Sequence, residues 1–412
     1  GTVPPMGYRT LFVTEANQMI KNDNEQVNQI DTDFYQITVN KNGTLTILDK
    51  RINKTFDEVL LLENSGDDGD EYDYSPLLND QVITNKDVEA DISLVQNTDK
   101  GIINVKYKLD VPADLESRKN GELNSQVAVH FTVEIPQDKP LIKVSCELDN
   151  QAKDHRLRAY IPTDIAATFS IADHQFGSIK RPVYDKAMDV WEEEKWSERP
   201  DSIYPMLSFV GLSNEEYGMS VLTNSTREYE IVGENYDTIA LTLFRCVGHL
   251  GKADLVRRPG RPSGILLPTP DSQMLGKITL DFALSTHDGE RLEAGIAKEY
   301  LTPIHAYNKI PHNAMKLNAS GIKTPLSYQM LSGFNSTIVL STLKKAEKQN
   351  AFVLRAYNPT ETSETLNILL NGERKEAYLT NLNEDIKKQI NLTDGQINHT
   401  IKPNQVQTIL FK

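Results

Sequence analysis

Apolar and polar residues alternate with a period of two through most of this 412-residue chain. Such alternation is typical of strands that bury one face, because successive side chains of a strand point to opposite sides of the sheet. The segment Asp33–Phe56 shows it best, since two alternating runs flank Lys41, Asn42 and Gly43, a combination typical of a hairpin turn. The sequence therefore predicts a mostly β protein built of stacked antiparallel sheets.

Helical periodicity is confined to short pieces such as Gly289–Tyr300, and strands do not alternate with helices, which argues against a parallel sheet. The strand pattern pauses near Thr302 and resumes in Met330–Lys412. We predict three segments on this basis. Residues 1–28 are a linker and lead-in strand that follow a missing N-terminal region, residues 29–300 form a large β domain, and residues 301–412 form a smaller β-sandwich domain.

Charge and cysteine content exclude several classes of partner. The chain carries 58 acidic and 44 basic residues, a net charge of -14, which argues against nucleic acid because its phosphates are bound mainly by cationic side chains. No apolar run approaches the roughly 18 residues of a membrane span, and no basic-then-apolar leader opens the chain. Cys146 and Cys246 lie in strand-like apolar runs, which indicates buried thiols rather than a disulfide framework. These features favour a cytoplasmic location.

An acidic loop lies within Glu63–Pro76. Its acidic side chains are Asp67, Asp68, Asp70, Glu71 and Asp73. Clustered carboxylates suit a hard cation such as calcium, but the spacing does not follow the order of an EF-hand loop, so an ordinary acidic turn remains the alternative. Tyr72 and Tyr74 in the same loop could stack on a sugar or fill a gap in the core.

The segment Ala240–Gly264 begins as a strand and ends in a loop rich in glycine, proline and arginine. Arg257, Arg258 and Arg261 stand among residues that cannot continue a central strand or helix. A rigid cationic loop at a strand end could position a polar ligand. Its arginines could equally pair with the acidic residues of the protein itself.

Trp191 and Trp196 are the two tryptophans of the chain. An exposed pair could form a platform for a sugar ring, whereas a buried pair would pack between sheets. The first possibility defines an alternative function, that of a stand-alone carbohydrate-binding or adhesive module. A surface for assembly into a homodimer is a third possibility.

The sequence contains no complete catalytic motif. None of the eight histidines has a second metal ligand at a suitable spacing, apart from the adjacent pair His287 and Asp288. Nucleophile elbows, phosphate-binding loops and dinucleotide fingerprints are also missing. Among 58 acidic residues, no spacing selects a pair for glycoside hydrolysis. From the residues alone, we predict no catalytic residue and no metal ligand in this chain.

Several separate segments, in order and spacing, resemble the C-terminal half of glycoside hydrolase family 38, the retaining α-mannosidases. The bacterial branch that includes mannosylglycerate hydrolase is the most similar. The segments are Ser65–Pro76, Phe176–Pro182, Ile203–Leu212, Leu241–Gly264, Thr269–Gly276 and Ala351–Glu361.

The resemblance implies a large antiparallel β supersandwich, galactose-mutarotase-like, followed by a smaller β-sandwich. It also implies a zinc-dependent α-mannosidase whose zinc ligands and aspartate nucleophile lie in an N-terminal domain absent from this chain. The implied partners are that catalytic domain and a mannoside substrate, and the isolated chain is expected to be inactive.

The resemblance further implies that the β domain contributes side chains to the mouth of the active site. Matched motif by motif, these are Tyr72 and Arg245, which would contact the sugar. Arg258 and Arg261 are carried over as further substrate-binding residues, because their charge would suit an anionic group on the substrate.

Overall fold

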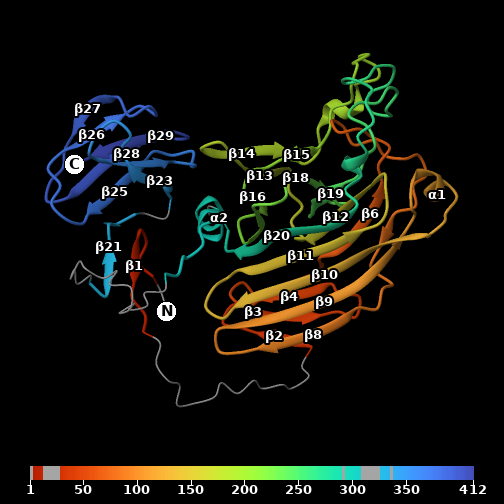
Figure 1. Cartoon of the computed structure of the whole chain (residues 1–412), viewed down its shortest axis with the longest axis horizontal. Helices are drawn as coiled ribbons and strands as arrows, with labels where there is room; N and C mark the ends of the chain where they lie inside the picture. The colour runs from red at the N-terminus through yellow and green to blue at the C-terminus, as the bar shows by residue number, and fades with distance from the viewer. Residues whose placement is uncertain (1–2, 13–27, 290–292, 308–324, 335–336) are drawn as a thin grey trace, which may run out of the picture. The chain divides into compact units, whose positions relative to one another are not determined.

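The structure is a computed structural model that describes residues 3–12, 28–289, 293–307, 325–334 and 337–412. In that part of the chain, no helix has the length and apolar character that a membrane crossing requires. The chain divides into two compact units (Figure 1). The larger unit consists of residues 20–173 and 179–293, and the smaller unit consists of residues 1–19, 174–178 and 294–412.

Three antiparallel sheets dominate the larger unit. The nine-stranded sheet has the order β14 (Gly177–Pro182), β13 (Phe169–His174), β16 (Phe209–Ser213), β17 (Gly218–Thr223), β20 (Gly276–His287), β11 (Ile142–Asn150), β10 (Ser125–Pro136), β9 (Lys100–Val111) and β8 (Asp91–Gln96). The six-stranded sheet has the order β15 (Ile203–Pro205), β18 (Glu228–Val232), β19 (Thr238–Arg245), β12 (His155–Pro162), β6 (Leu61–Gly66) and β7 (Ile83–Thr84). The four-stranded sheet has the order β2 (Gln29–Asp31), β3 (Tyr35–Val39), β4 (Leu45–Asp49) and β5 (Lys54–Val59).

Helices in the larger unit are short. They are α1 (Leu115–Lys119) and the 3-10 turns Lys186–Asp189 and Pro270–Gln273. The predicted hairpin within Asp33–Phe56 is confirmed, since β3 pairs with β4 across a turn in which Gly43 has a φ of +82°. A left-handed conformation of this kind favours glycine, which explains why the turn ends on one.

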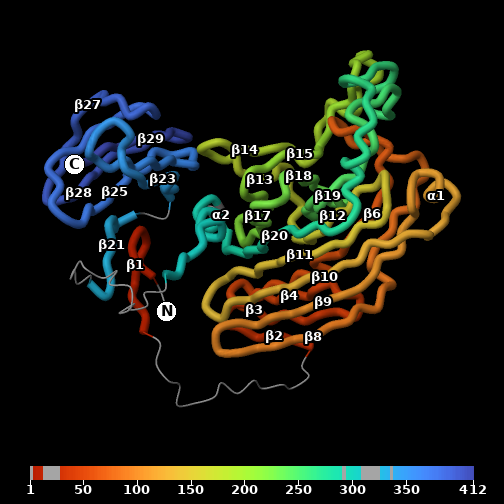
Figure 2. Tube along the Cα trace, in the orientation of Figure 1, coloured from red at the N-terminus to blue at the C-terminus, as the bar shows by residue number. Residues whose placement is uncertain are grey.

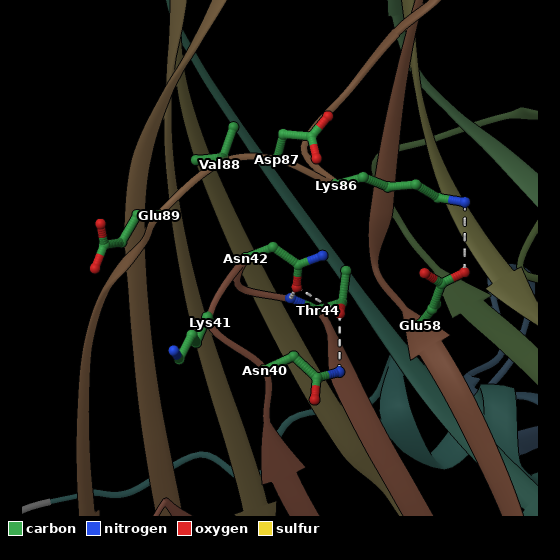
Figure 3. A pocket seen from close by; sticks show the side chains of 9 residues that line it. All are labelled: Asn40, Lys41, Asn42, Thr44, Glu58, Lys86, Asp87, Val88 and Glu89. Atoms are coloured by element: carbon green, nitrogen blue, oxygen red, sulfur yellow. Dashed lines mark hydrogen bonds and ion pairs between the residues drawn. The ribbon is translucent and has the colours of Figure 1, made fainter.

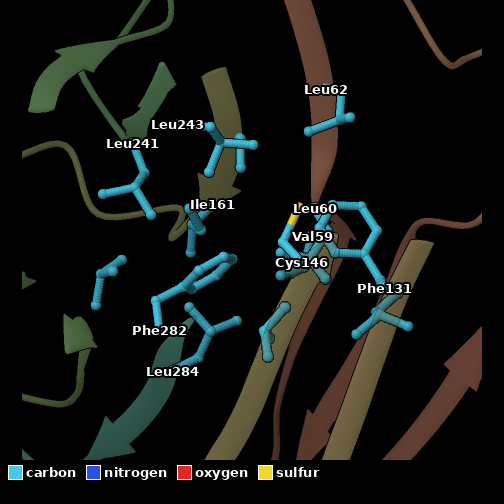
Figure 4. Close-up of a cluster of buried hydrophobic side chains, with 14 of the residues drawn as sticks. Val59, Leu60, Leu62, Phe131, Cys146, Ile161, Leu241, Leu243, Phe282 and Leu284 are labelled. Carbon is cyan, nitrogen blue, oxygen red and sulfur yellow. The ribbon is translucent and has the colours of Figure 1, made fainter. Parts of the chain in front are cut away.

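Apolar side chains from all three sheets share one core. Ile161 of β12, Leu241 of β19 and Phe282 of β20 meet there (Figure 4). Cys146 packs in the same core, and both cysteines are buried free thiols, as predicted. Burial raises the pKa of both thiols, so the thiolate is disfavoured and neither cysteine is suited to act as a nucleophile.

The smaller unit is a β-sandwich with its own core. Its five-stranded sheet has the order β23 (Val339–Lys345), β24 (Phe352–Tyr357), β29 (Val406–Phe411), β26 (Ala377–Thr380) and β27 (Ile386–Ile390). Its three-stranded sheet has the order β22 (Leu331–Ser332), β25 (Glu364–Leu370) and β28 (Gln396–Ile401). Ile368 and Ile397 of the smaller sheet pack with Leu354 and Phe411 of the larger one. The strands β1 (Gly7–Arg9) and β21 (Ser327–Gln329) form a separate antiparallel pair.

The expectation of a mostly β protein with a large antiparallel assembly and a smaller sandwich is thus confirmed. The helix predicted at Gly289–Tyr300 is present as α2 (Glu293–Tyr300), although residues 290–292 lie outside the described residues. Most of the predicted lead-in, residues 13–27, also lies outside them. The boundaries proposed after residues 28 and 300 remain predictions.

A bulge at the end of β19 decides which way Arg245 points. Leu241 pairs with Ala159 and Thr242 with Arg158, but the next pair joins Phe244 to Leu157, so Leu243 is an extra residue. With strict alternation Arg245 would follow Leu241 and Leu243 into the core, because a shift of one residue exchanges the two faces of a strand. After the bulge, Arg245 instead pairs with Arg156.

Candidate functional site

The candidate site starts from a row of polar residues across three adjacent strands. Ser65 of β6 pairs with Arg156 of β12, which pairs in turn with Arg245 of β19. Directly paired residues in a sheet point to the same face, so these three side chains lie side by side. The next pair of β6 and β12 on the same face is also polar. There, Arg158 Nε donates to Glu63 Oε2 at 2.6 Å. The six-stranded sheet therefore has one apolar face in the core and one face that carries buried charges.

Loops from distant parts of the chain gather beyond the ends of these strands (Figure 2). The acidic loop continues β6, and the arginine-rich loop follows β19. Backbone hydrogen bonds join the loops, because the Glu71 amide donates to the His249 carbonyl and the Arg199 amide donates to the Arg257 carbonyl. The acidic loop, the arginine-rich loop and the segment around Arg199 are far apart in sequence, and these bonds bring them together into one surface.

Asp67 is the link between the acidic loop and β19. One carboxylate oxygen accepts from Arg245 Nε at 2.7 Å, and the other accepts from the amides of Gly69 and Ser75. Gly69 is required at its position, because a Cβ there would lie 2.1 Å from the carbonyl oxygen of Asp73. The side chain of Asp67 therefore shapes the loop while it fixes the guanidinium of Arg245.

Asp70 is the second organising carboxylate of the loop. Its Oδ1 accepts from the amides of Tyr72 and Asp73, and its Oδ2 accepts from Arg258, from the Lys252 amide and from a serine hydroxyl. Arg258 also forms an ion pair with Asp73. Both Arg258 and Asp70 have 0% of their side chains exposed. The acidic and arginine-rich loops are locked together by a buried ion pair.

Four aspartates of the acidic loop are therefore paired with arginine or lysine side chains of the protein. Asp67 is paired with Arg245, Asp68 with Lys252, and Asp70 and Asp73 with Arg258. Of the two interpretations of this loop, the structure supports the acidic turn, since arginine and lysine neutralise the carboxylates that a calcium ion would use.

Tyr72 stands at the surface of the same loop, with 56% of the residue exposed. Its ring lies against Gly264, since a Cβ at that glycine would come within 3.2 Å of the Tyr72 hydroxyl. The Tyr72 amide is held by Asp70, whose carbonyl accepts from Arg245 Nη2 at 3.2 Å. Tyr72 and Arg245 are thus both fastened to one residue. Arg261 is more than half exposed and lies 3.5 Å from Glu198.

For Tyr74, the sequence left open whether the ring stacks on a sugar or fills a gap in the core. Its ring faces the guanidiniums of Arg156, Arg257 and Arg245, with centroid distances of 3.6, 5.1 and 5.9 Å. Arg156 was not singled out in the sequence at all. Along β12, Arg156 stands on the face of the strand that is turned away from the core residues Leu157 and Ala159. This alternation is the one signal in the sequence that could have marked Arg156 as a residue of the site.

The surroundings shift the pKa of the two neighbouring arginines in opposite directions. Burial alone would lower the pKa of Arg245, but the carboxylate of Asp67 raises it above its ordinary value. Burial, reinforced by the positive charges of Arg199 and Arg156, lowers the pKa of Arg257 to about 10. Arg257 also forms an ion pair with Asp201.

The tryptophans do not form the pair of exposed rings that a sugar platform requires. Trp191 is buried, with 8% of the residue exposed, whereas Trp196 is 44% exposed. The alternative of a stand-alone carbohydrate-binding module therefore loses the aromatic surface on which it depended.

The described residues do not suit zinc. No group of three or more histidine, cysteine or acidic side chains among them could hold a metal ion. His155 has one ring nitrogen on Asn64 and the other on Asn150, and burial, with the charge of Arg118, lowers its pKa to about 3.

A separate hollow of about 510 Å³ lies beside the turn between β3 and β4, and its lining is mostly polar (Figure 3). Asn42 there accepts from Thr44, and Lys86 lies 3.7 Å from Glu58. Its polar side chains largely bond to one another, and it shares no residue with the site around Arg245.

Two family models match the chain. Residues 30–254 match the glycosyl hydrolases family 38 C-terminal domain, and residues 337–409 match the glycosyl hydrolases family 38 C-terminal beta sandwich domain. The first match alone spans more than half of the chain and contains Tyr72 and Arg245, whereas Arg258 and Arg261 lie beyond its end.

Two curated relatives are longer than this chain. A "Putative mannosylglycerate hydrolase" of Halalkalibacterium halodurans is 25% identical over 99% of this chain and 45% of the relative. "Alpha-mannosidase G" of Dictyostelium discoideum is 25% identical over 89% of this chain and 32% of the relative. The chain therefore spans less than half the length of these two relatives.

Solved structures share the fold. An alpha-mannosidase from Enterococcus faecalis V583 superposes with a TM-score of 0.78 at 24% identity, over 93% of this chain and 42% of the other. A family 38 glycosyl hydrolase from Enterococcus faecalis superposes with a TM-score of 0.76 at 22% identity, over 98% of this chain and 46% of the other.

Proposed function

Because this chain belongs to glycosyl hydrolase family 38, we propose that it is the C-terminal portion of an α-mannosidase that hydrolyses terminal α-mannosides with retention. Its role is to complete the substrate pocket and to pack on a catalytic region that lies elsewhere in the same polypeptide. The family match and the named relatives support the reaction class.

One observation carries the assignment of the site. Asp70 fixes the backbone of Tyr72 through its carboxylate and the guanidinium of Arg245 through its carbonyl. A tyrosine ring and an arginine thus form one rigid, partly exposed pair. Rigid placement of groups that touch a substrate favours reaction, because the orientation of the substrate is then set before the chemical step.

Each member of the pair has a distinct part. Arg245 Nε and Nη2 are engaged with Asp67 and Asp70, while Nη1 has no hydrogen-bond partner among the residues described. We assign Nη1 to a sugar hydroxyl or to a carboxylate of the catalytic region. The exposed ring of Tyr72 offers an apolar face to the sugar and a hydroxyl as a hydrogen-bond donor.

Arg258 and Arg261 receive different parts. Arg258 has no exposed surface, so we propose that it positions the acidic loop through Asp70 and Asp73 instead of contacting the sugar directly. Arg261 is exposed, and we keep it as a residue that contacts the outer part of the substrate.

An exposed apolar strip beside Tyr72 supports docking of another region. It consists of Ile265, Leu266, Leu267, Met274 and Leu275, each more than two-fifths exposed. Contiguous exposed apolar surface is typical of an interaction site. Packing of the catalytic region on this strip would exclude water from the sugar pocket next to Tyr72.

An activity assay of the isolated 412-residue chain tests whether hydrolysis requires the proposed catalytic region. The isolated chain should release no product from an aryl α-mannoside, with or without added zinc, because the nucleophile and the acid of glycoside hydrolysis would lie in the catalytic region elsewhere in the polypeptide. Turnover by the isolated chain that one carboxylate substitution abolishes would refute the proposal. The longer polypeptide that contains the chain is the positive control.

A further inference from the structure

Arg156 is a buried cation without an anionic partner. Only 3% of the residue is exposed, and its guanidinium forms no hydrogen bond or ion pair within the described residues. Two of its nitrogens, Nε and Nη1, are fully buried. Removing a charge from water is unfavourable unless a partner replaces the lost hydration, so an unpaired buried arginine requires an explanation.

The neighbours of Arg156 increase the positive charge at this point. The guanidiniums of Arg156 and Arg257 both face the ring of Tyr74, and the positive charge of Arg199 acts on Arg257 as well. The aromatic face of Tyr74 offers partial compensation, because an arginine above a ring is attracted to its negative face. Arg156 lies nearest to the ring of Tyr74, at 3.6 Å from its centroid, compared with 5.1 Å for Arg257 and 5.9 Å for Arg245.

The nearby carboxylates are already engaged. Asp201 forms the ion pair of Arg257, and Asp67 forms the ion pair of Arg245. No ion pair is found for the side chain of Arg199 within the described ranges. Arg156 and Arg257 at the ring of Tyr74, with Arg199 bonded through its amide to the Arg257 carbonyl, thus have one ion pair among them within the described residues, that of Arg257 with Asp201.

A second polar group beside Arg156 is also unsatisfied. Ser65 pairs with Arg156 across β6 and β12, and its hydroxyl is buried without a hydrogen-bond partner among the residues described. A hydroxyl and a guanidinium are both donors to an anion. Two neighbouring donors on one sheet face therefore lack an acceptor.

We propose that Arg156, Arg199 and Arg257, together with Tyr74, form a binding site for a small oxyanion, namely a phosphate, sulfate or carboxylate group. Guanidiniums suit such groups, because their planar array of N–H donors matches the oxygens of a carboxylate or phosphate. Arg199 and Tyr74 are half-buried, so the anion reaches the cluster from their side. Arg156 supplies positive charge from beneath the ring. This inference is independent of the proposed mannosidase activity.

Titration calorimetry on the 412-residue chain tests the site with inorganic phosphate, inorganic sulfate, lactate and a hexose phosphate, with chloride at matched ionic strength as the background. We expect one anion per chain, and at least a tenfold loss of affinity in both Arg156→Gln and Arg199→Gln. Arg227→Gln is the matched control, because Arg227 is exposed and, among the described residues, its guanidinium donates only to the carbonyls of Thr226 and Asn224. It should bind the anions as the unaltered chain does.

Tighter binding of the hexose phosphate than of inorganic phosphate would identify an anionic sugar as the ligand, and equal binding would identify the free anion. If Arg156→Gln does not fold, Arg199→Gln decides alone, since its side chain is only half-buried. Absence of binding for all four anions, or unchanged affinity in the folded variants, would overturn the proposal. Either failure would leave the roles proposed for Tyr72 and Arg245 untouched.

Discussion

The two units of the molecule place their charges differently. In the larger unit, Arg258 and Asp70 form an ion pair with no exposed surface, and Arg158 lies buried against Glu63. In the smaller unit, Lys348 and Asp385 pair with about half of each side chain exposed. Burying an ion pair has a high desolvation cost that only well-placed hydrogen bonds offset. Buried charges that gather at one end of a sheet therefore indicate a functional site, whereas exposed pairs are ordinary surface features.

Among these variants, removal of the Arg258 side chain should lower the free energy of unfolding the most. Arg258→Ala leaves Asp70 buried without its cation, and loss of one partner of a buried pair typically costs about 3–5 kcal/mol. Urea unfolding of the chain should show the loss. Arg261→Ala, at an exposed position in the same loop, should change the free energy of unfolding by less than about 0.5 kcal/mol. Equal stability of the two variants would show that the buried pair does not hold the loops together.

Acidification should destabilise the larger unit through His155. Its pKa is about 3 in the folded chain, while an unfolded histidine has a pKa of about 6.5. Between these values the unfolded state binds a proton that the folded state does not, so stability is greatest above pH 6.5 and falls as the pH drops toward 3. The slope due to this group is at most about 1.4 kcal/mol per pH unit. Urea unfolding at several pH values should show a flatter profile for His155→Asn, and an unchanged profile would contradict the assignment.

Arg245 should affect activity more than stability. Arg245→Ala, made in a polypeptide that joins this chain to the proposed catalytic region, should lower kcat/KM for an aryl α-mannoside about ten- to a hundredfold, as expected for a lost hydrogen bond to a charged group. Arg227→Ala serves as the control, since it lies outside the site. An unchanged kcat/KM in Arg245→Ala would remove this residue from the substrate pocket.

Tyr72→Phe should have a smaller effect. It keeps the exposed ring and removes one neutral hydrogen bond, worth about 1 kcal/mol, so kcat/KM should fall about fivefold. Tyr72→Ala should lower it further, because the ring is also lost. If both variants react as fast as the unaltered polypeptide, the tyrosine does not contact the sugar.

The surface pair of the smaller unit should have the smallest effect. The hydrogen bond from Lys348, with those from Asn381 and Asn383, lowers the pKa of Asp385 to about 2. The stabilisation is therefore present above the ordinary pKa of an aspartate and is lost as the pH falls through about 2. Lys348→Gln should leave urea unfolding at pH 7 unchanged within error, since water and salt screen an exposed pair. A clear loss of stability would contradict the contrast between the two units.

Alternation along the chain determined a large part of this protein. It was enough to predict antiparallel sheets, the hairpin of β3 and β4 and the burial of both cysteines, because the side chains of a strand take opposite faces in turn. Six segments that agree in order and spacing, Ser65–Pro76 and Leu241–Gly264 among them, were enough to indicate the family. These properties depend on neighbouring residues, which the sequence displays directly.

Only the tertiary structure decided the arrangement of charges at the site. A bulge of one residue turned Arg245 out of the core, and no alternation pattern marks such an insertion in advance. Arg258 was identified as an arginine of a rigid cationic loop that could bind a ligand or pair with an acidic residue, and its pairing with Asp70, 188 residues away, buries it completely. Arg156 gained its neighbours Ser65, Tyr74 and Arg245 from three separate segments. Whether a charge is buried or paired depends on residues distant along the chain, and it is therefore decided by folding.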